Sequence, residues 1–461
     1  MALKHKEFPM HSQPAINPIS ILTLLLTAGI ALPAMAQPVN EDSKLLAFDG
    51  ASGDGFGHSI AIHDGAVAVG ASTDDDNGVN SGSAYILHLI LDLAPVKLLA
   101  NDGAAGDLFG HSVAIGPAVI GPSNTVVAVV GAPNDSDQGS SSGSAYIFRM
   151  GGSQHTKLTP NDGALGDNFG VSVAIDNGVV VVGSPEDDDN GIDSGSVYLF
   201  DANTGAQFAK LLPPNGAAND AFGQKVAISG DIIAVSAPRH HNAGIESGSV
   251  YLFSASKSSY IGEFSSGEGI FFEQFGYSLA IDNGNVAVGA LGAATAYVYD
   301  ADTLGRVSQL VPSTPGNAYG WSIDIDGNKV AVGAISDPIN GTQSGSAFFF
   351  NAFTGNEIAK LAPSDGAFFE QFGSSAGIDN DLLVIGARND NDNGSGSGSA
   401  YVFDTYCPAD LNGDGVLDFF DIAAFLTAFT NQSPIGDFNN DNSFDFFDIA
   451  AFLAAFSAGC P

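Results

Sequence analysis

Residues 157–200 read KLTPNDGALGDNFGVSVAIDNGVVVVGSPEDDDNGIDSGSVYLF, and this stretch decides the fold of the 461-residue chain. It joins a Lys-Leu pair, a glycine-rich turn, a Phe-Gly pair, two runs of β-forming residues, an acidic loop and a final β-type run. Similar stretches follow one another from residue 44 to residue 404. The aromatic residue of the Phe-Gly or Tyr-Gly landmark is, in successive copies, Phe56, Phe109, Phe169, Phe222, Phe275, Tyr319 and Phe372. Their nearly regular spacing indicates a tandem array of seven repeats.

Each copy contains four short runs of β-forming residues separated by glycine-rich or Asn-Gly turns. In the quoted copy these runs are Lys157-Leu158, Val171 to Ile175, Val179 to Val182 and Ser196 to Phe200. Four strands per repeat at this period predict an all-β fold, a seven-bladed β-propeller over residues 37–405. The array begins with a lone Lys44-Leu45-Leu46 run and ends on Ala400 to Phe403. We therefore expect the first strand to complete the last blade, which closes the ring and removes exposed strand edges.

The residues inside the repeat also predict how the blades pack. The Val-Ala-Val-Gly-Ala runs alternate small residues with valine, so we expect small residues where strands converge and valine between blades. Phe56 and its equivalents recur at one repeat position, which is typical of core packing between blades. Stacking on a ligand is the alternative role for these rings.

Two copies show the landmarks of a known family. Phe109-Gly110 is followed by Gly131-Ala132-Pro133, and Phe169-Gly170 by Gly183-Ser184-Pro185. This pattern resembles the FG-GAP repeats of integrin α-chain propellers. The resemblance covers nearly all of residues 44–404. It implies a seven-bladed propeller, often with calcium in loops between strands, and a protein or glycan ligand on one face.

Acidic loops follow the Gly-Ala-Pro element in four copies. Carboxylates on a short turn are the ligands that calcium prefers, and glycine permits such a turn. The candidate weak metal ligands are Asp74, Asp76, Asp135, Asp137, Asp187, Asp189, Asp390 and Asp392. The loops lack the recurring acidic residue that ends a twelve-residue calcium loop, so an Asx-rich turn capped by its own side chains is the alternative.

Three copies lack this loop. The fourth has Arg239-His240-His241, the fifth Leu291-Gly292-Ala293, and the sixth Asp337-Pro338-Ile339-Asn340. Adjacent histidines point apart in an extended chain, so His240 and His241 indicate a distinct surface patch and not a zinc site. Such differences among blades are where a ligand face could arise.

The composition changes after Cys407, where two calcium loops of the EF-hand type are predicted. Oxygen ligands at loop positions 1, 3, 5, 7, 9 and 12 define such a loop. The first loop offers Asp410, Asn412, Asp414, the Val416 carbonyl, Asp418 and Asp421; the second offers Asp437, Asn439, Asp441, the Ser443 carbonyl, Asp445 and Asp448. Position 6 is Gly415 in the first loop and Asn442 in the second. Since asparagine tolerates the positive φ that this position needs, the second loop should also bind Ca²⁺, more weakly.

A helix is expected after each loop, and no matching helix before it. Two loop-helix units within residues 406–461, with Cys-Pro at both ends, resemble a cysteine-flanked dockerin. The resemblance implies a cohesin-like or other cell-surface partner, bound through loop positions 10 and 11. Those positions are Phe419, Phe420, Phe446 and Phe447. We expect one phenylalanine of each pair to pack between the helices, and the other to form an exposed apolar patch.

Composition and processing signals place the chain outside the cell. Residues 1–36 contain Lys4 and Lys6, an apolar stretch and Ala34-Met35-Ala36, which predict a signal peptide cleaved after Ala36 and a secreted or cell-surface protein. A membrane anchor is the alternative, but the stretch is short for a span and the mature chain contains no other. Oxidising surroundings favour a Cys407–Cys460 disulfide. The net charge of -37 excludes nucleic acid as a partner.

No catalytic constellation is evident in the sequence. Gly139-Ser140-Ser141-Ser142-Gly143 matches a hydrolase motif in letters only, since it lies in a serine-rich loop and not between a strand and a helix. The sequence therefore predicts a non-enzymatic, calcium-binding adhesion or scaffold protein. A lectin or carbohydrate-active enzyme in an extracellular polysaccharide-degrading complex is the alternative, because a pair of catalytic carboxylates could lie among so many acids.

Overall fold

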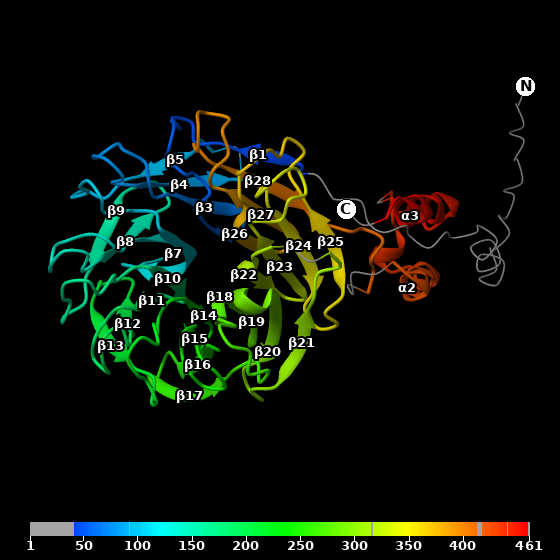
Figure 1. The fold of residues 1–461 in the computed structure, drawn as a ribbon. Helices are drawn as coiled ribbons and strands as arrows, with labels where there is room; N and C mark the ends of the chain where they lie inside the picture. Colours follow the sequence, from blue (N-terminus) through cyan, green and yellow to red (C-terminus); the bar gives the residue numbers. More distant parts are fainter. Residues whose placement is uncertain (1–40, 92, 315–316, 413–416, 440, 460–461) are drawn as a thin grey trace, which may run out of the picture. The chain divides into compact units, whose positions relative to one another are not determined.

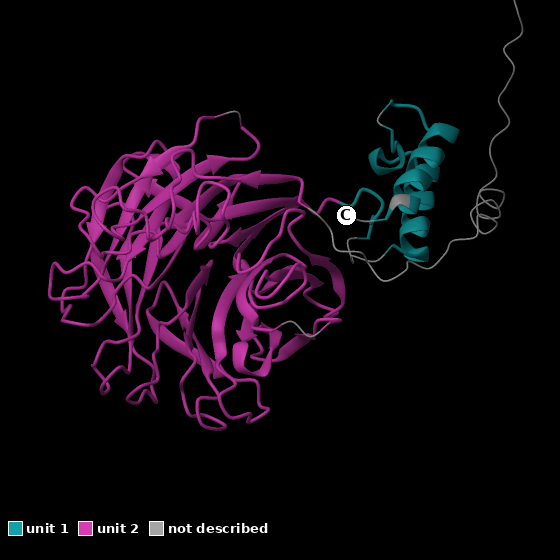
Figure 2. Cartoon of the chain, turned by 45° about the horizontal axis from the view of Figure 1, so that its top comes forward, with its two compact units in different colours: residues 1–36, 407–460 teal, residues 37–406, 461 magenta. Residues whose placement is uncertain are grey.

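The computed structural model describes residues 41–459, apart from residues 92, 315–316, 413–416 and 440. The predicted signal peptide, Cys460, Asp414 and Val416 thus lie outside the described residues. The chain forms two compact units that divide between Tyr406 and Cys407 (Figure 2). In the described part of the chain, no helix is both long enough and apolar enough to cross a membrane.

The larger unit is a ring of seven four-stranded antiparallel sheets, which confirms the predicted seven-bladed propeller (Figure 1). The strands of blades 1–4 are, in order, β2 (Ser59–His63), β3 (Ala66–Ala71), β4 (Ser83–His88), β5 (Val96–Leu98); β6 (Ser112–Ile120), β7 (Ser123–Ala132), β8 (Ser144–Arg149), β9 (Gln154–Leu158); β10 (Ser172–Asp176), β11 (Val179–Ser184), β12 (Ser196–Asp201), β13 (Gln207–Leu211); and β14 (Val226–Ser229), β15 (Ile232–Ala237), β16 (Ser249–Ser254), β17 (Ser259–Phe264). Those of blades 5–7 are β18 (Phe275–Asp282), β19 (Asn285–Ala290), β20 (Thr295–Asp300), β21 (Arg306–Leu310); β22 (Tyr319–Asp326), β23 (Lys329–Ala334), β24 (Ser346–Asn351), β25 (Glu357–Leu361); and β26 (Phe372–Asp379), β27 (Leu382–Ala387), β28 (Ser399–Asp404), β1 (Ser43–Leu45). A 3-10 turn, η1 (Leu291–Ala293), joins β19 to β20.

The outer strand of each blade comes from the next repeat along the chain. The Lys-Leu run that opens one repeat pairs with the last strand of the repeat before it, as β9 pairs with β8. The first strand, β1, has no preceding repeat and pairs instead with β28 of blade 7, with Lys44 opposite Tyr401. This confirms the expected closure of the ring by its first strand, which leaves β28 no free edge.

The core lies between neighbouring blades, as the repeat predicts. One cluster combines Val129 and Ile147 of blade 2 with Val173 and Val182 of blade 3. The landmark rings are buried in these clusters. Phe109, for example, meets Tyr146 edge to face, with ring centroids 5.4 Å apart. The structure therefore confirms that the landmark aromatics are core residues.

Near the axis, the first strands of the blades are joined by a repeated hydrogen bond. The serine two residues after a landmark glycine donates to the carbonyl oxygen of the next landmark glycine. The bonds are 2.8–2.9 Å long for Ser59, Ser112, Ser278, Ser322 and Ser375. The approach leaves no room for a side chain, since a Cβ added to Gly131 would lie 2.0 Å from the carbonyl oxygen of Gly170. The close approach of neighbouring blades at the axis thus explains why the first position of the Gly-Ala element is glycine.

All acidic loops lie on one face of the ring, which we call the loop face. Because the strands alternate in direction, the loop after the second strand of a blade and the loop leading into the next first strand meet at the same end. Large apolar side chains are exposed at the tips of these loops. They are Val79, Leu165, Ile192, Ile245, Phe271, Phe272, Phe368 and Phe369.

Over its described residues, the smaller unit has two helices, α2 (Phe419–Thr430) and α3 (Phe446–Ala458), with a short 3-10 turn η2 (Pro434–Gly436) between them. Each helix begins with a capping box, made by Asp418 with Asp421 and by Asp445 with Asp448. The helices pack through equivalent residues, since the rings of Phe425 and Phe452 stack 4.2 Å apart at an angle of 1°.

One sequence-based expectation about this unit was wrong. Neither member of the Phe419-Phe420 pair, nor of the Phe446-Phe447 pair, packs between the helices, and all four are 56–65% exposed. The buried stripe of α2 starts one residue later, at Asp421 and Ile422, and continues to Phe425. Because Asp421 points toward its own loop, the two residues before it, Phe419 and Phe420, lie outside the core between the helices.

Candidate functional site

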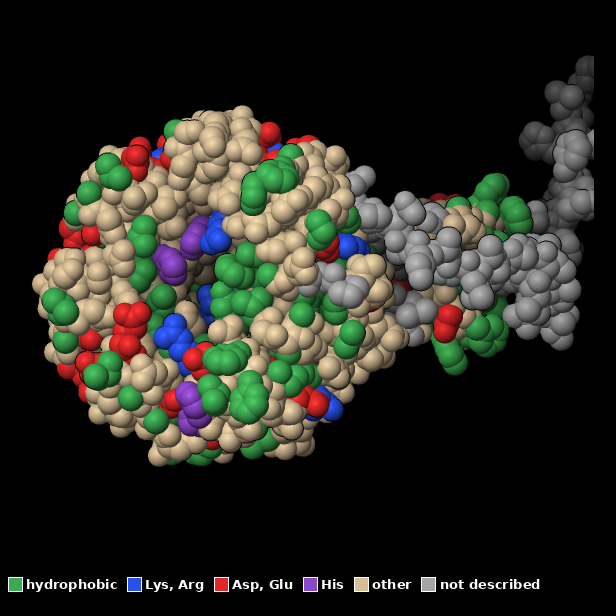
Figure 3. Space-filling view, viewed as in Figure 1, with side chains coloured by type: hydrophobic (Ala, Val, Ile, Leu, Met, Phe, Trp, Pro, Cys, Tyr) green, Lys and Arg blue, Asp and Glu red, His purple; other side chains and the backbone are tan. Residues whose placement is uncertain are grey.

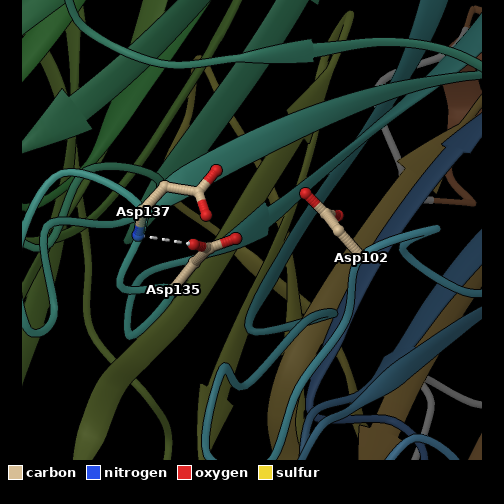
Figure 4. Close-up of side chains that lie close together, drawn as sticks. All are labelled: Asp102, Asp135 and Asp137. Carbon is tan, nitrogen blue, oxygen red and sulfur yellow. Dashed lines mark hydrogen bonds between the residues drawn. The ribbon is translucent and has the colours of Figure 1, made fainter.

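In blade 2, three carboxylates surround the side chain of one lysine. Lys157 lies on β9, and its Nζ atom is 2.7 Å from Asp102, 2.8 Å from Asp135 and 2.6 Å from Asp137. Asp135 and Asp137 belong to the acidic loop after β7, while Asp102 comes from the loop after β5 (Figure 4). One oxygen from each of the three lies within 4.8 Å of the others. The ammonium group therefore occupies the position where a cation would contact all three carboxylates.

The same arrangement recurs in three more blades, and we call these sites the lysine clusters. Each contains one lysine of the outer strand, two aspartates of the acidic loop and one from the preceding loop. The sets are Lys97 with Asp49, Asp74 and Asp76; Lys210 with Asp162, Asp187 and Asp189; and Lys44 with Asp365, Asp390 and Asp392, all at 2.7–3.1 Å. All eight aspartates predicted as weak metal ligands thus lie around lysine ammonium groups.

The buried aspartate of each cluster has its hydrogen-bonding capacity filled by the protein. In blade 3, Asp187 accepts hydrogen bonds from Ser196 Oγ, Tyr198 Oη and Lys210 Nζ, at 2.8–3.1 Å. Burial alone would raise the pKa of Asp187, but these donors outweigh it and hold the pKa below its ordinary value. Burial likewise opposes the charged form of Lys210, yet bonds to three carboxylates hold its pKa above the usual range. Both groups are therefore charged at neutral pH.

Across the seven blades, the lysine and the buried aspartate occur together or not at all. Blade 6 retains the pair, since Lys360 Nζ lies 2.8 Å from Asp337. In blade 4 both positions have changed: Glu263 stands opposite Tyr251 where blade 3 has Lys210 opposite Tyr198, and His240 replaces the aspartate. Blade 5 has Gln309 in place of the lysine, and its short loop, η1, has no acid. The lysine and the buried aspartate are thus either both kept or both replaced in a blade.

The two histidines of blade 4 point apart, as predicted. His240 is buried, and its Nδ1 lies 2.9 Å from Asp220, whereas His241 is exposed. The hydrogen bond to Asp220 raises the pKa of His240, against the opposing effect of burial. His240 is therefore part of the blade, and only His241 belongs to the surface.

In the C-terminal unit, the second predicted calcium loop is described except for residue 440. Its acidic side chains turn toward the backbone of the loop: Asp437 accepts hydrogen bonds from the N–H groups of Asp441 and Asn442, and Asp448 from those of Asn439 and Asp445. Asn442 adopts a φ of 64°, the conformation predicted for position 6. The loop thus has the fold of a compact oxygen-lined turn.

The described part of the first loop follows the same plan. Asp421 is fully buried and accepts hydrogen bonds from the N–H groups of Leu411, Asn412 and Asp418, as Asp448 does from its own loop. Burial raises the pKa of Asp421 despite these bonds, and the nearby Asp410 adds to the rise. A divalent cation would offset the repulsion between the Asp410 and Asp421 carboxylates. The oxygen-only donor set fits Ca²⁺.

Sequence reasoning missed the lysine clusters, although the signal was present. The Lys-Leu pair opens the repeat pattern, and an acidic loop follows in the same copy. The lysine, however, pairs with the acidic loop of the preceding repeat, because the outer strand of a blade comes from the next repeat. Only that offset between repeat and blade brings the two together.

Comparison with known proteins agrees with the fold. The family model described as FG-GAP repeat matches residues 39–87, 95–148, 153–200, 206–253, 308–350 and 356–403, which together make up more than half of the chain. A search of the curated proteins found no match. The matched segments leave out residues 254–307, yet β18 to β20 lie there and form a complete blade with β21. On this repeat and this ring of seven blades, the chain belongs to the FG-GAP repeat family.

Proposed function

We propose that this is a secreted, non-enzymatic interaction protein, in which the propeller presents a recognition face and the C-terminal unit is a dockerin-type module that attaches the chain to a cell-surface partner. The observation that carries the proposal is the exposure of four phenylalanines, 56–65% each, at positions 10 and 11 of the two predicted calcium loops. Exposed apolar clusters of this kind mark protein interfaces.

The module is small, and its calcium loops are proposed to hold these phenylalanines in place. When bound, Ca²⁺ would neutralise the clustered carboxylates of Asp437, Asp441 and Asp448 and of the equivalent first loop. Phe446 and Phe447 are the first two residues of α3, whose start is fixed by the capping box of Asp445 and Asp448. Asp448 thus belongs both to the loop and to the helix start, so loop and interface are expected to order together. A Cys407–Cys460 disulfide is proposed to join the ends of the module.

In the propeller, we propose that lysine and not calcium neutralises the acidic loops. The support is the joint loss of both charges in blades 4 and 5, and the position of each Nζ between three carboxylates. An added Ca²⁺ would meet the ammonium group at contact distance and would be repelled by it. Recognition by the loop face is then independent of calcium, and attachment by the module depends on it.

Binding is proposed in preference to catalysis because the carboxylates of the lysine clusters are already paired. Glycoside cleavage needs a pair of carboxylates that are free to donate and accept protons. The buried aspartates of the lysine clusters are already bonded within the protein: Asp187 to Lys210, Ser196 and Tyr198, and Asp390 to Lys44 and Tyr401. The exposed apolar tips of the loop face suit a protein surface better than a catalytic cleft.

A pull-down from the envelope proteins of the producing cells tests the proposal. The bait is the full chain, as wild type and with Phe419, Phe420, Phe446 and Phe447 all changed to serine. We expect the wild type to capture a partner in calcium and to release it in chelator, and the variant to lose about 100-fold in affinity, because hot-spot aromatics carry most of the binding energy of an interface.

The matched control changes four phenylalanines of the loop face, Phe271, Phe272, Phe368 and Phe369, to serine in the same chain. These side chains are 46–65% exposed, so both variants remove similar apolar surface. The control should keep the calcium-dependent partner. Capture that survives the first set of substitutions, or that ignores the chelator, contradicts the proposed role of the module.

A further inference from the structure

A pocket with a volume of about 370 Å³ opens where the first strands of the blades converge on the axis. Its wall includes His58 and His111, Lys225, Tyr277 and Trp321, and Arg388. Arg388 directly follows β27, the second strand of blade 7, and the other five residues lie at or next to the starts of first strands. Both places are at the loop-face end of a blade, so the pocket opens toward the loop face. Figure 3 shows histidine, lysine and arginine side chains gathered in the hollow at the middle of the ring.

The pocket differs in charge from the rest of the molecule. The chain carries a net charge of -37, yet the residues that line the pocket, all within the described ranges, include no aspartate or glutamate. Two basic side chains, Lys225 and Arg388, face it instead. A positive pocket in a strongly acidic protein is a site that attracts a compact anion.

Both cations are departures from the repeat. Lys225 occupies the position where the other six copies have serine, as in Ser172 and Ser278. That serine bonds neighbouring blades in five copies, so the lysine replaces a structural hydrogen bond with a charge. Arg388 occupies the position of Pro133 and Pro185. Two independent positions of a regular repeat therefore place positive charge in the same pocket.

Among the residues that the structure describes, Lys225 has no acidic partner. The other described lysines that are at least partly buried, such as Lys157 and Lys360, form ion pairs at 2.5–3.1 Å. Within the residues that the structure describes, no hydrogen bond or ion pair involves Nζ of Lys225. Burial lowers the pKa of Lys225, which a bound anion would reverse.

The remaining wall residues supply neutral contacts. Arg388 donates from Nε to Gln371 at 2.8 Å and lies over the Trp321 ring, 5.5 Å from its centroid, which leaves the terminal nitrogens of its guanidinium group available. Burial lowers the pKa of His58 to about 3 and that of His111 to about 4, so both are neutral hydrogen-bonding groups at pH 7. Tyr277 and Trp321 lie together, 5.3 Å between ring centroids, and offer apolar surface.

We propose that the axial pocket binds a small organic acid through its carboxylate, with Lys225 and Arg388 as the anchoring groups and with an apolar ring or chain of the ligand beside Tyr277 and Trp321. The volume suits a single sugar acid or a compound of similar size. Long polyanions are disfavoured, because the acidic loops around the pocket repel them. The proposal deepens the binding role of the propeller and does not depend on the C-terminal module.

Calorimetric titration of the full chain with galacturonate, and with galactose as the uncharged counterpart of the same ring, tests this site. The critical variant is Lys225→Ser, which restores the serine of the other copies and should fold at least as well as the wild type. We expect galacturonate to bind the wild type, galactose not to bind, and Lys225→Ser to weaken the affinity by about 10- to 100-fold. Arg388→Gln should have a similar effect.

The control is Lys257→Ser, which removes the same charge from an exposed position outside the pocket. It should change the affinity less than about twofold. Equal binding of the two sugars, or an unchanged affinity in Lys225→Ser that melts as the wild type does, overturns the proposal. Binding of a glutamate-rich peptide without binding of galacturonate overturns it in favour of a protein ligand. Neither result bears on the envelope partner of the C-terminal module.

Discussion

Replacing Lys157 with methionine should lower the free energy of unfolding of the propeller by about 3–5 kcal/mol, the range expected when one partner of a buried ion pair is removed. Methionine keeps the apolar stem of the lysine but leaves Asp135, whose side chain is 5% exposed, beside Asp102 and Asp137 without a cation. Urea denaturation of the full chain, followed by tyrosine and tryptophan fluorescence, measures the change. The matched control is Lys257→Met at an exposed position.

A second variant separates loss of the charge pair from loss of packing. Adding Asp135→Asn to Lys157→Met removes the unpaired buried charge, while the asparagine oxygen can still accept the hydrogen bond from Tyr146. We expect the double variant to recover more than half of the lost stability. Millimolar calcium should also stabilise the single variant in part, since its three carboxylates then lack a cation. A single variant within about 0.5 kcal/mol of the wild type would contradict the role given to the lysine clusters.

Removal of the closing strand should have the largest effect on the ring as a whole. A chain that starts at Phe48 lacks β1, so β28 of blade 7 is left with a free edge, and Asp365, Asp390 and Asp392 lose Lys44. The exposed edge should pair with other molecules. We therefore expect a melting temperature more than about 10 °C below that of the wild type, together with aggregation, from a combined loss of several kcal/mol.

The control for this truncation is a chain that starts at Glu41, which keeps β1 and its pairing with β28. Differential scanning fluorimetry and size-exclusion chromatography of the two chains provide the comparison. The Glu41 chain should behave as the full chain does. If the chain that starts at Phe48 remains monomeric and melts within about 2 °C of the control, closure by β1 does not stabilise the ring.

Much of the fold follows from the sequence, because the repeat specifies it seven times. The landmark at Phe275 predicts a fifth blade even though that copy has lost its acidic loop, and β18 to β21 form that blade. The closing strand follows from the lone Lys44-Leu45-Leu46 run, and the core role of Phe109 from its recurrence. These features depend on local pattern and period, which a single sequence contains.

Most of the features that could not be predicted from the sequence depend on contacts between different repeats. Lys44 and Asp390 are 346 residues apart in the chain, and only ring closure brings them within 2.9 Å. Lys225 and Arg388 are unremarkable departures from a repeat until the first strands converge on one axis. The outward direction of Phe419 and Phe420 depends on where the helix-packing stripe begins, which the spacing of apolar residues in α2 did not settle.

Lysine is proposed to neutralise the acidic loops of the propeller, and calcium those of the C-terminal unit. Counting the calcium ions that the chain binds tests this central claim directly. Equilibrium titration of the full chain with calcium, compared with a variant carrying Asp437→Ala and Asp441→Ala in the second loop and Asp410→Ala in the first, gives the number of ions and their location. We predict two ions for the wild type, one for each C-terminal loop, and none for the variant. Calcium that remains bound to the variant, or several further ions in the wild type, would place metal in the propeller loops and contradict the claim.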